Sequence, residues 1–330
     1  MKVTRACLAI VAAVSTHGAS AADEIDQRNA AIAFMDAVAF SSGKRLPYYR
    51  THSLHDKDTA IDTVLIIIPG GINNGPKYFA AGLDAARQAG RSASTAVMAL
   101  QFQTAEENPR RDELYWTGAW QQGADSLDGS RTSSFSVLDE VLTRAVGSFP
   151  AATSVVLAGH SSGGQIINRY AATGGDIADH DKITFVVMNP STYVYIDDRR
   201  ARADGSFAPP GDAAQTCPRY DHWKYGLVDP QPYVQALTPA EVRSRMMRRN
   251  VVYLGGGADD KTGGGVDARC PAMYQGRTRL ERTLTYWRYI QTFPEWRANA
   301  RLAIARGIGH SGGGMIRSKE FGEIVFGRGD

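Results

Sequence analysis

The sequence has 330 residues, of which 43% are hydrophobic and 22% are charged, and its formal net charge is +3. This composition is that of a folded globular protein and excludes a low-complexity or fibrous chain. The small positive charge gives no sign of the basic surface that nucleic-acid binding requires, so no nucleic-acid partner is expected.

The amino-terminal residues have the pattern of a secretory signal. Lys2 and Arg5 precede the mostly apolar stretch 6–14, and a small-residue Ala-Ser-Ala cleavage site follows. This pattern predicts a signal peptide over residues 1–21, whose removal lowers the net charge from +3 to +1. The apolar stretch is shorter than the roughly 20 residues that span a membrane. We therefore expect residues 22–330 to be exported to a periplasm or secreted, with no integral membrane segment.

The cysteines predict one disulfide. Cys7 is removed with the signal peptide, which leaves Cys217 and Cys270, 53 positions apart, to pair in an oxidising compartment. Two cysteines so far apart provide too few ligands for a metal site, so no metal is expected.

Along the chain, residues 24–40 have alanine-rich helical character, and residues 46–52 are typical of an edge strand because proline and aromatic residues flank them. Residues 63–68 form a continuous apolar run, which indicates a strand covered on both faces of a parallel sheet. A glycine-rich turn and a helix over residues 78–88 follow.

The alternation of strand and helix then repeats. It predicts an α/β fold in which helices flank both faces of a mostly parallel sheet. Residues 190–249 interrupt the pattern with many prolines and aromatics, and we interpret them as an irregular, cap-like insertion in one domain. The further expected elements are strands 95–102, 155–158, 184–188, 251–254 and 302–305, helix 135–146, a helix ending near Phe293 with Leu280, Leu284, Trp287 and Ile290 on its apolar face, and a terminal helix through Glu320.

The strand at 155–158 leads into Gly159-His-Ser-Ser-Gly163, which matches G-x-S-x-G between a strand and a helix. In this context the serine lies on a sharp turn with its hydroxyl exposed above the sheet. Ser161 is therefore the candidate nucleophile, at the amino end of a helix whose free N–H groups favour an oxyanion.

A serine nucleophile needs a base, and His310 is the histidine in the right place. It follows the last expected strand, at the same sheet edge as Ser161, whereas His160 should point away from the serine. Asp259 follows the strand at 251–254 and is the preferred acid, with Asp260 as the near alternative. Asp197 or Asp198, after the preceding strand, are the distant alternatives.

The oxyanion of a tetrahedral intermediate needs N–H donors. One should come from Ser162, the residue after the nucleophile, and the other from the loop after the strand at 63–68. Gly71 is the preferred second donor and Ile72 the alternative. The candidates for the substrate pocket are Asn74, His160, Tyr193, Trp223 and Tyr225.

Residues 307–312 also match G-x-G-x-x-G after a strand, which is a pattern of dinucleotide binding. Too little chain follows to complete a βαβ unit, so no cofactor is expected.

With these residues and several further motifs, the chain resembles exported proteins that have the α/β-hydrolase fold. The resemblance extends over nearly the whole mature chain. Within that superfamily the chain is similar to a group with a Gly-His-Ser-x-Gly-Gly-Gln elbow. The shared motifs are Gly159–Gln165, Asn189-Pro-Ser-Thr-Tyr193, Cys217-Pro-Arg-Tyr220, Trp223-Lys-Tyr-Gly-Leu227 and Gln275-Gly276. The chain has Pro69-Gly70 where many members have His-Gly, which affects the identity of the oxyanion donor.

The resemblance implies a hydrolase with a Ser–Asp–His triad. We expect Ser161, His310 and Asp259 to cleave carboxylic esters of small molecules or polymers through an acyl-enzyme intermediate. Two other functions stay open, namely a peptidase or amidase with the same triad, and a non-catalytic binding protein on a hydrolase scaffold. The sequence assigns no oligomeric state.

Overall fold

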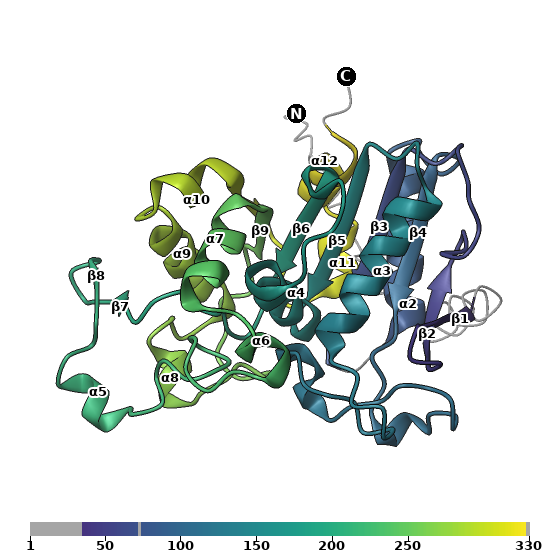
Figure 1. Ribbon diagram of the computed structural model, residues 1–330. Coiled ribbons are helices and arrows are strands. Elements are labelled where there is room, and N and C mark those ends of the chain that lie inside the picture. Colours follow the sequence, from purple (N-terminus) through teal and green to yellow (C-terminus); the bar gives the residue numbers. More distant parts are fainter. Residues whose placement is uncertain (1–34, 72–73, 328–330) are drawn as a thin grey trace, which may run out of the picture.

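The computed structural model of the protein describes residues 35–71 and 74–327, so the predicted signal peptide lies outside the described residues. Its central feature is an eight-stranded sheet in the order β1-β2-β4-β3-β5-β6-β9-β10 (Figure 1). The strands are β1 (Met35–Ala39), β2 (Arg45–Arg50), β3 (Thr63–Ile68), β4 (Thr95–Leu100), β5 (Ser154–His160), β6 (Ile183–Met188), β9 (Asn250–Gly256) and β10 (Ala300–Ala305). A small hairpin, β7 (Arg200–Ala201) with β8 (Phe207–Ala208), lies outside this sheet.

The six strands from β4 to β10 in this order are parallel to one another, and β2 pairs antiparallel with β4 and with β1. The apolar run of β3 is buried on both faces of the sheet. Val64 and Ile66 belong to the hydrophobic core on one face, and Leu65 and Ile67 to that on the other. The continuous hydrophobic pattern of the central strands thus reflects two helical layers.

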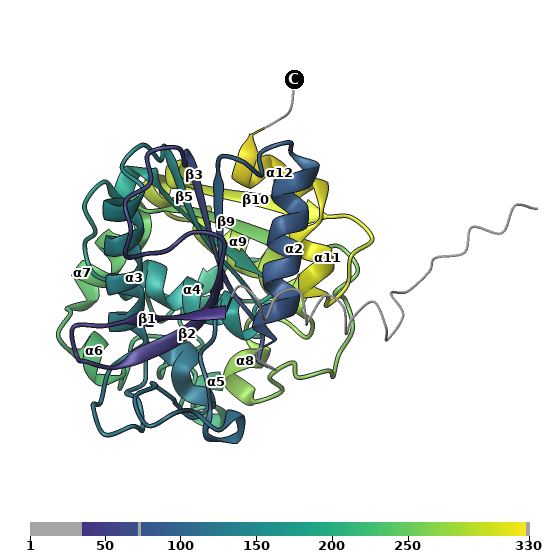
Figure 2. The same ribbon diagram turned by 90° about the vertical axis from the view of Figure 1, so that its right-hand side faces the viewer.

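Helices cover both faces of the sheet, as Figure 2 shows. Helices α2, α11 and α12 lie on one face, and α3, α4, α7 and α9 on the other. The α-helices are α2 (Gly75–Gln88), α3 (Ser134–Ser148), α4 (Ser162–Thr173), α5 (Ala213–Thr216), α6 (Pro232–Gln235), α7 (Pro239–Arg248), α8 (Cys270–Met273), α9 (Arg279–Ile290), α10 (Pro294–Asn299), α11 (Gly312–Ile316) and α12 (Lys319–Phe326), and the 3₁₀ helices are η1 (Ala105–Glu107), η2 (Gly118–Gln122) and η3 (His180–Lys182).

The predicted α/β layering and the parallel central strands are confirmed, but the helix expected over residues 24–40 is wrong where the structure describes it. Residues Met35–Ala39 form β1, which pairs antiparallel with β2, and residues 24–34 lie outside the described part. Pairing with a neighbouring strand outweighs the weak helix preference of the local sequence. Because β1 pairs with the outer side of β2, β2 is not the edge strand that was expected.

The apolar face predicted for α9 is correct only in part, because Ile290 is buried and Trp287 packs against the core but Leu284 does not. Leu284 is 41% exposed, whereas Arg282 is fully buried. The Arg282 guanidinium donates hydrogen bonds to the backbone carbonyls of Gly276, Ser191 and Asp267. A buried cation is tolerated where carbonyl oxygens replace the water that hydrates it. These hydrogen bonds hold the side of α9 that carries Arg282 toward the protein interior.

The irregular segment 190–249 contains only short elements before α7, and α7 packs on α4.

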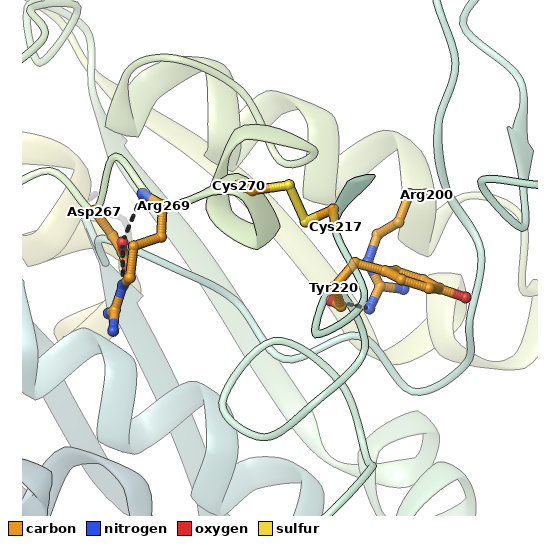
Figure 3. Close-up of a disulfide and its surroundings, with 6 residues drawn as sticks. All are labelled: Arg200, Cys217, Tyr220, Asp267, Arg269 and Cys270. Carbon is orange, nitrogen blue, oxygen red and sulfur yellow. Dashed lines mark hydrogen bonds and ion pairs between the residues drawn. A yellow bond between two sulfur atoms is a disulfide. The ribbon is translucent and has the colours of Figure 1, made fainter. Parts of the chain in front are cut away.

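The predicted disulfide is confirmed. Cys217, just after α5, is joined to Cys270 at the start of α8, with the two Cα atoms 5.9 Å apart (Figure 3). The bond therefore ties the irregular segment to the loop that precedes α8. Among residues 35–71 and 74–327, no helix combines the length and apolarity needed to cross a membrane.

Candidate active site

Ser161 lies at the junction where β5 ends and α4 begins. Its backbone φ is +57°, a conformation that is costly for a residue with a Cβ atom. The Ser161 N–H donates to the carbonyl of Met188 at the end of β6, at 2.9 Å, which holds the turn in place. This is the strained strand-to-helix turn that the G-x-S-x-G motif predicts.

The glycines of the motif allow the close approach of three backbone segments. A methyl group added at Gly159 would lie 2.3 Å from the carbonyl oxygen of Gly163, and one added at Gly163 would lie 2.1 Å from that of Ile68. A side chain at Gly159 would separate β5 from the start of α4, and one at Gly163 would separate α4 from the end of β3. The two glycines therefore fix where the hydroxyl of Ser161 lies.

The structure brings Ser161, His310 and Asp259 together at the carboxyl ends of β5, β10 and β9. The Nε2 atom of His310 lies 3.1 Å from the Ser161 hydroxyl, and its Nδ1 atom lies 2.8 Å from the Asp259 carboxylate. Asp259 is buried, with a side chain that is 4% exposed, whereas that of His310 is 28% exposed. The imidazole is thus anchored on one side and open to the cavity on the other.

The alternative acids lie elsewhere. Asp260 is exposed. Asp197 accepts hydrogen bonds from Arg199 and from the hydroxyl of Tyr289. Of the candidate acids, Asp259 is therefore the one that the structure shows hydrogen-bonded to His310.

A buried cation that the sequence did not single out lies behind Asp259. The guanidinium of Arg279, the first residue of α9, is 3.6 Å from the second carboxylate oxygen of Asp259, and it donates to the carbonyl of Gly264. Burial lowers the pKa of Arg279, and the charge of Asp259 opposes that shift. The sequence gives no local signal for this role of Arg279, because Asp259 lies in another segment of the chain.

The two predicted oxyanion donors are neighbours in space. A methyl group added at Gly71 would lie 3.0 Å from the Ser162 hydroxyl oxygen, so the loop after β3 adjoins the start of α4. A methyl group added at Gly70, by contrast, would lie 3.2 Å from the Tyr78 hydroxyl oxygen, and Gly71 stays the predicted second donor. The alternative donor, Ile72, lies outside the described residues.

A cavity of about 460 Å³ opens beside Ser161. Its described walls come mainly from glycine-rich loops, and no residue of segment 190–249 is among them. The lining residues are Gly70, Gly71, Asn74, Lys77, Tyr78, His160, Ser161, Ser162, Gly264, Gly265, Arg279, His310, Ser311, Gly312 and Gly313.

Two of the five candidate pocket residues, Asn74 and His160, line this cavity. The side chains of the other three pack elsewhere. Tyr193 is fully buried and bonds Thr283, Trp223 donates from its indole to the carbonyl of Gln122, and the Tyr225 hydroxyl donates to Asp267. The aromatic residues of the irregular segment therefore contribute to the hydrophobic core and its polar supports.

His160 is 3% exposed, and its ring centroid lies 4.6 Å from that of His310. Burial holds the pKa of His160 well below its usual value, and the nearby His310 and Arg279 act in the same direction. His160 is therefore neutral at physiological pH.

No three His, Cys, Asp or Glu side chains within residues 35–71 and 74–327 are grouped so as to hold a metal ion.

Comparison with protein-family models gave no match, and comparison with curated proteins gave none either. Solved structures do resemble the chain. Poly(aspartic acid) hydrolase-1 from Sphingomonas sp. KT-1 is 19% identical, with a TM-score of 0.62 over 88% of this chain and 98% of that one. The poly(3-hydroxybutyrate) depolymerase LpqC from Bordetella parapertussis is 19% identical, with a TM-score of 0.60 over 90% of this chain and 91% of that one. These likenesses, with the sheet order described above, show that the chain has the α/β-hydrolase fold.

Proposed function

We propose that the protein is a serine hydrolase that cleaves carboxylic esters, with Ser161 as nucleophile, His310 as base and Asp259 as the orienting acid. The observation that carries the proposal is the unbroken chain of two hydrogen bonds, 3.1 Å and 2.8 Å long, from the Ser161 hydroxyl through the imidazole to a buried carboxylate. A serine held on a strained turn and bonded to such a pair is suited to nucleophilic attack.

In the proposed reaction, the Ser161 oxygen attacks the ester carbonyl while His310 accepts the hydroxyl proton. The N–H groups of Ser162 and Gly71 bind the oxyanion that forms. The intermediate then expels the alcohol, which takes the proton from His310, and leaves an acyl group on Ser161. Water repeats the sequence, releasing a carboxylic acid and regenerating the serine. Asp259 stabilises the imidazolium in both halves.

The substrate in this proposal is a small molecule or a polymer ester with a polar acyl group. Among the described wall residues there is no Leu, Ile, Val, Met, Phe or Trp, and the walls consist of glycine backbone, the Asn74 amide, the Tyr78 phenol, serine hydroxyl groups, imidazoles and basic side chains. Such walls offer few contacts to a long alkyl chain. The similar fold of a poly(3-hydroxybutyrate) depolymerase makes polyesters reasonable substrates to assay.

The second candidate function is amide hydrolysis by the same triad. The poly(aspartic acid) hydrolase with a similar fold is the reason to consider amide hydrolysis, because that polymer is joined by amide bonds.

We also propose that the protein is exported, either to a periplasm or outside the cell. The Cys217–Cys270 disulfide supports this, because such bonds persist in oxidising compartments.

Labelling with a fluorophosphonate, followed by hydrolysis of p-nitrophenyl esters, tests the proposal. The wild-type protein should be labelled on Ser161, and Ser161→Ala should lose labelling and up to about 10⁶-fold of its turnover. Ser311→Ala is the matched control, because this serine also lines the cavity but caps α11 through Gly314. An unlabelled wild-type protein with intact near-UV circular dichroism would favour a binding protein on this scaffold.

A panel of p-nitrophenyl esters of increasing acyl length, assayed beside p-nitroanilide peptides, separates the two chemistries. We expect kcat/KM to be highest for short or polar acyl groups and to fall for chains beyond about eight carbons. Peptide anilides cleaved faster than every ester would replace the ester proposal with the amidase.

A further inference from the structure

Tyr78 lies where three loops of the candidate active site meet. Its side chain comes from the first turn of α2, directly after the loop that contains Gly71, and it is 7% exposed. The Tyr78 hydroxyl lies 2.8 Å from Nδ1 of His160, and a methyl group added at Gly70 would lie 3.2 Å from its oxygen. A methyl group added at Gly312, just after His310, would lie 2.2 Å from the same hydroxyl. One phenol thus contacts the oxyanion loop, the elbow and the histidine loop.

The hydrogen bond between Tyr78 and His160 joins the two side chains whichever of them donates, because a phenol can donate or accept and the roles depend on the imidazole tautomer. The backbone of Gly70 lies close to the phenol oxygen and acts to lower the pKa of Tyr78, against the larger effect of burial. Nε2 of His160 is buried and has no hydrogen-bond partner among the described residues, so the hydrogen bond at Nδ1 is the one that orients the ring.

The orientation of the His160 ring in turn restricts the orientation of the His310 ring. The two rings are tilted by 37° with their centroids 4.6 Å apart, so His160 forms a wall against which the second imidazole packs. Because His160 is neutral, it does not repel His310 when that ring carries a proton. A rotated or charged His160 would disturb the geometry between His310 and Ser161.

We propose, on the basis of the hydrolase function proposed above, that Tyr78 is a positioning residue of the active site. Through His160 it fixes the imidazole of His310 in reach of Ser161, and through Gly70 it fixes the loop that presents the Gly71 N–H. It forms no bond to the reacting atoms. Its effect is on the relative placement of base, nucleophile and oxyanion donor, to which rates are sensitive at the level of about 1 Å.

The first test is Tyr78→Phe, which removes only the hydroxyl. We expect kcat for p-nitrophenyl acetate and the rate of fluorophosphonate labelling to fall about 10- to 100-fold, while KM changes by less than about twofold. Tyr170→Phe is the matched control. That tyrosine is also buried, and its hydroxyl donates to Asp139 at 2.7 Å on the other face of the sheet, so its loss should leave kcat unchanged.

The second test is Gly312→Ala, whose methyl group would displace the Tyr78 side chain. If both changes act through the same contact, the two effects on kcat will not multiply. We expect the double variant Tyr78→Phe/Gly312→Ala to be within about threefold of the slower single variant. A double variant slowed by the full product of the two factors would mean that Tyr78 does not connect the loops.

The outcomes separate this inference from the function on which it rests. If wild-type protein shows neither labelling nor activity that depends on Ser161, the hydrolase proposal fails. If the wild-type protein is active through Ser161 but Tyr78→Phe keeps its kcat, the positioning role is wrong while the hydrolase stands. A rise in KM alone would also overturn the inference, because it would identify the hydroxyl as a substrate contact.

Discussion

The guanidinium of Arg279 and the carboxylate of Asp259 lie 3.6 Å apart, and each side chain is only 4% exposed. The same carboxylate accepts the hydrogen bond from His310 through its other oxygen. Asp259 is therefore held between a cation of α9 and the imidazole of the histidine loop. A buried carboxylate in this position needs both partners to stay charged and oriented.

Arg279→Met should remove that support. We expect the free energy of unfolding to fall by about 3 kcal/mol, since removing one partner leaves the buried charge of Asp259 undercompensated. The kcat should fall as well, because the acid is then free to turn from His310. Urea unfolding and ester hydrolysis measure the two effects. Arg301→Met, at an exposed position of β10, is the control for loss of an arginine charge; equal stability of the two variants would contradict the structural role of Arg279.

The elbow glycines give a prediction about folding that needs no substrate. Gly163→Ala would place a methyl group 2.1 Å from the carbonyl oxygen of Ile68, and such overpacking should destabilise the fold by about 3 kcal/mol or more. Gly147→Ala is its matched control. Gly147 lies in α3 with no atom within 4 Å of the added methyl, so the change should stabilise the helix by up to about 1 kcal/mol. Thermal unfolding of both variants checks the opposite signs.

The disulfide should contribute to stability through the unfolded chain. Cys217→Ser and Cys270→Ser each open the same loop, whose closure is worth up to about 4 kcal/mol in the chain-entropy model. The double variant should be no less stable than either single variant, and reduction of the wild-type protein should bring its urea midpoint to theirs. Variants that match the oxidised wild-type midpoint would show that the cross-link does not stabilise the fold.

The sequence was sufficient to predict those features that depend on local pattern. The buried strands are continuous apolar runs, and the glycine spacing around Ser161 defines the elbow. Because the carboxyl ends of parallel strands meet at one edge, the positions of Asp259 and His310 after β9 and β10 predicted that they would lie near Ser161. The structure shows this proximity, with hydrogen bonds of 2.8 Å and 3.1 Å.

The features that were missed depend on contacts between distant segments. Arg282 and Leu284 lie two positions apart on α9, and a hydrophobicity pattern buries the leucine, whereas backbone carbonyls from two other loops bury the arginine. Tyr78 has the spacing of an ordinary helical core residue. Its contact with His160, 82 positions away, has no local sequence signal.

The last prediction concerns alkaline pH and a cluster of buried tyrosines. Burial raises the pKa of each above its ordinary value near 10, because the phenolate would lose its water. These side chains pack against one another between β6, β9 and α9, with ring centroids 4.3 to 6.0 Å apart in the pairs they form. The cluster consists of Tyr193, Tyr195, Tyr253, Tyr286 and Tyr289.

The sign follows from proton binding. Above pH 10 the unfolded chain releases these protons and the folded protein keeps them, so the folded state binds more protons and its stability falls as the pH rises. Below pH 10 both states are protonated and the contribution is constant. Each tyrosine adds up to about 1.4 kcal/mol of destabilisation per pH unit. Urea midpoints from pH 8 to 11, with tyrosinate absorbance at 295 nm, follow the effect.

Tyr195→Phe isolates one member of the cluster. The Tyr195 hydroxyl is buried and has no hydrogen-bond partner among the described residues, so its removal breaks no bond. Below pH 10 the variant should be as stable as the wild-type protein or slightly more stable. Above pH 10 its stability should fall less steeply, by up to about 1.4 kcal/mol per pH unit. Parallel curves for the two proteins, with tyrosinate forming near pH 10 before unfolding, would mean that these hydroxyls ionise in the folded state.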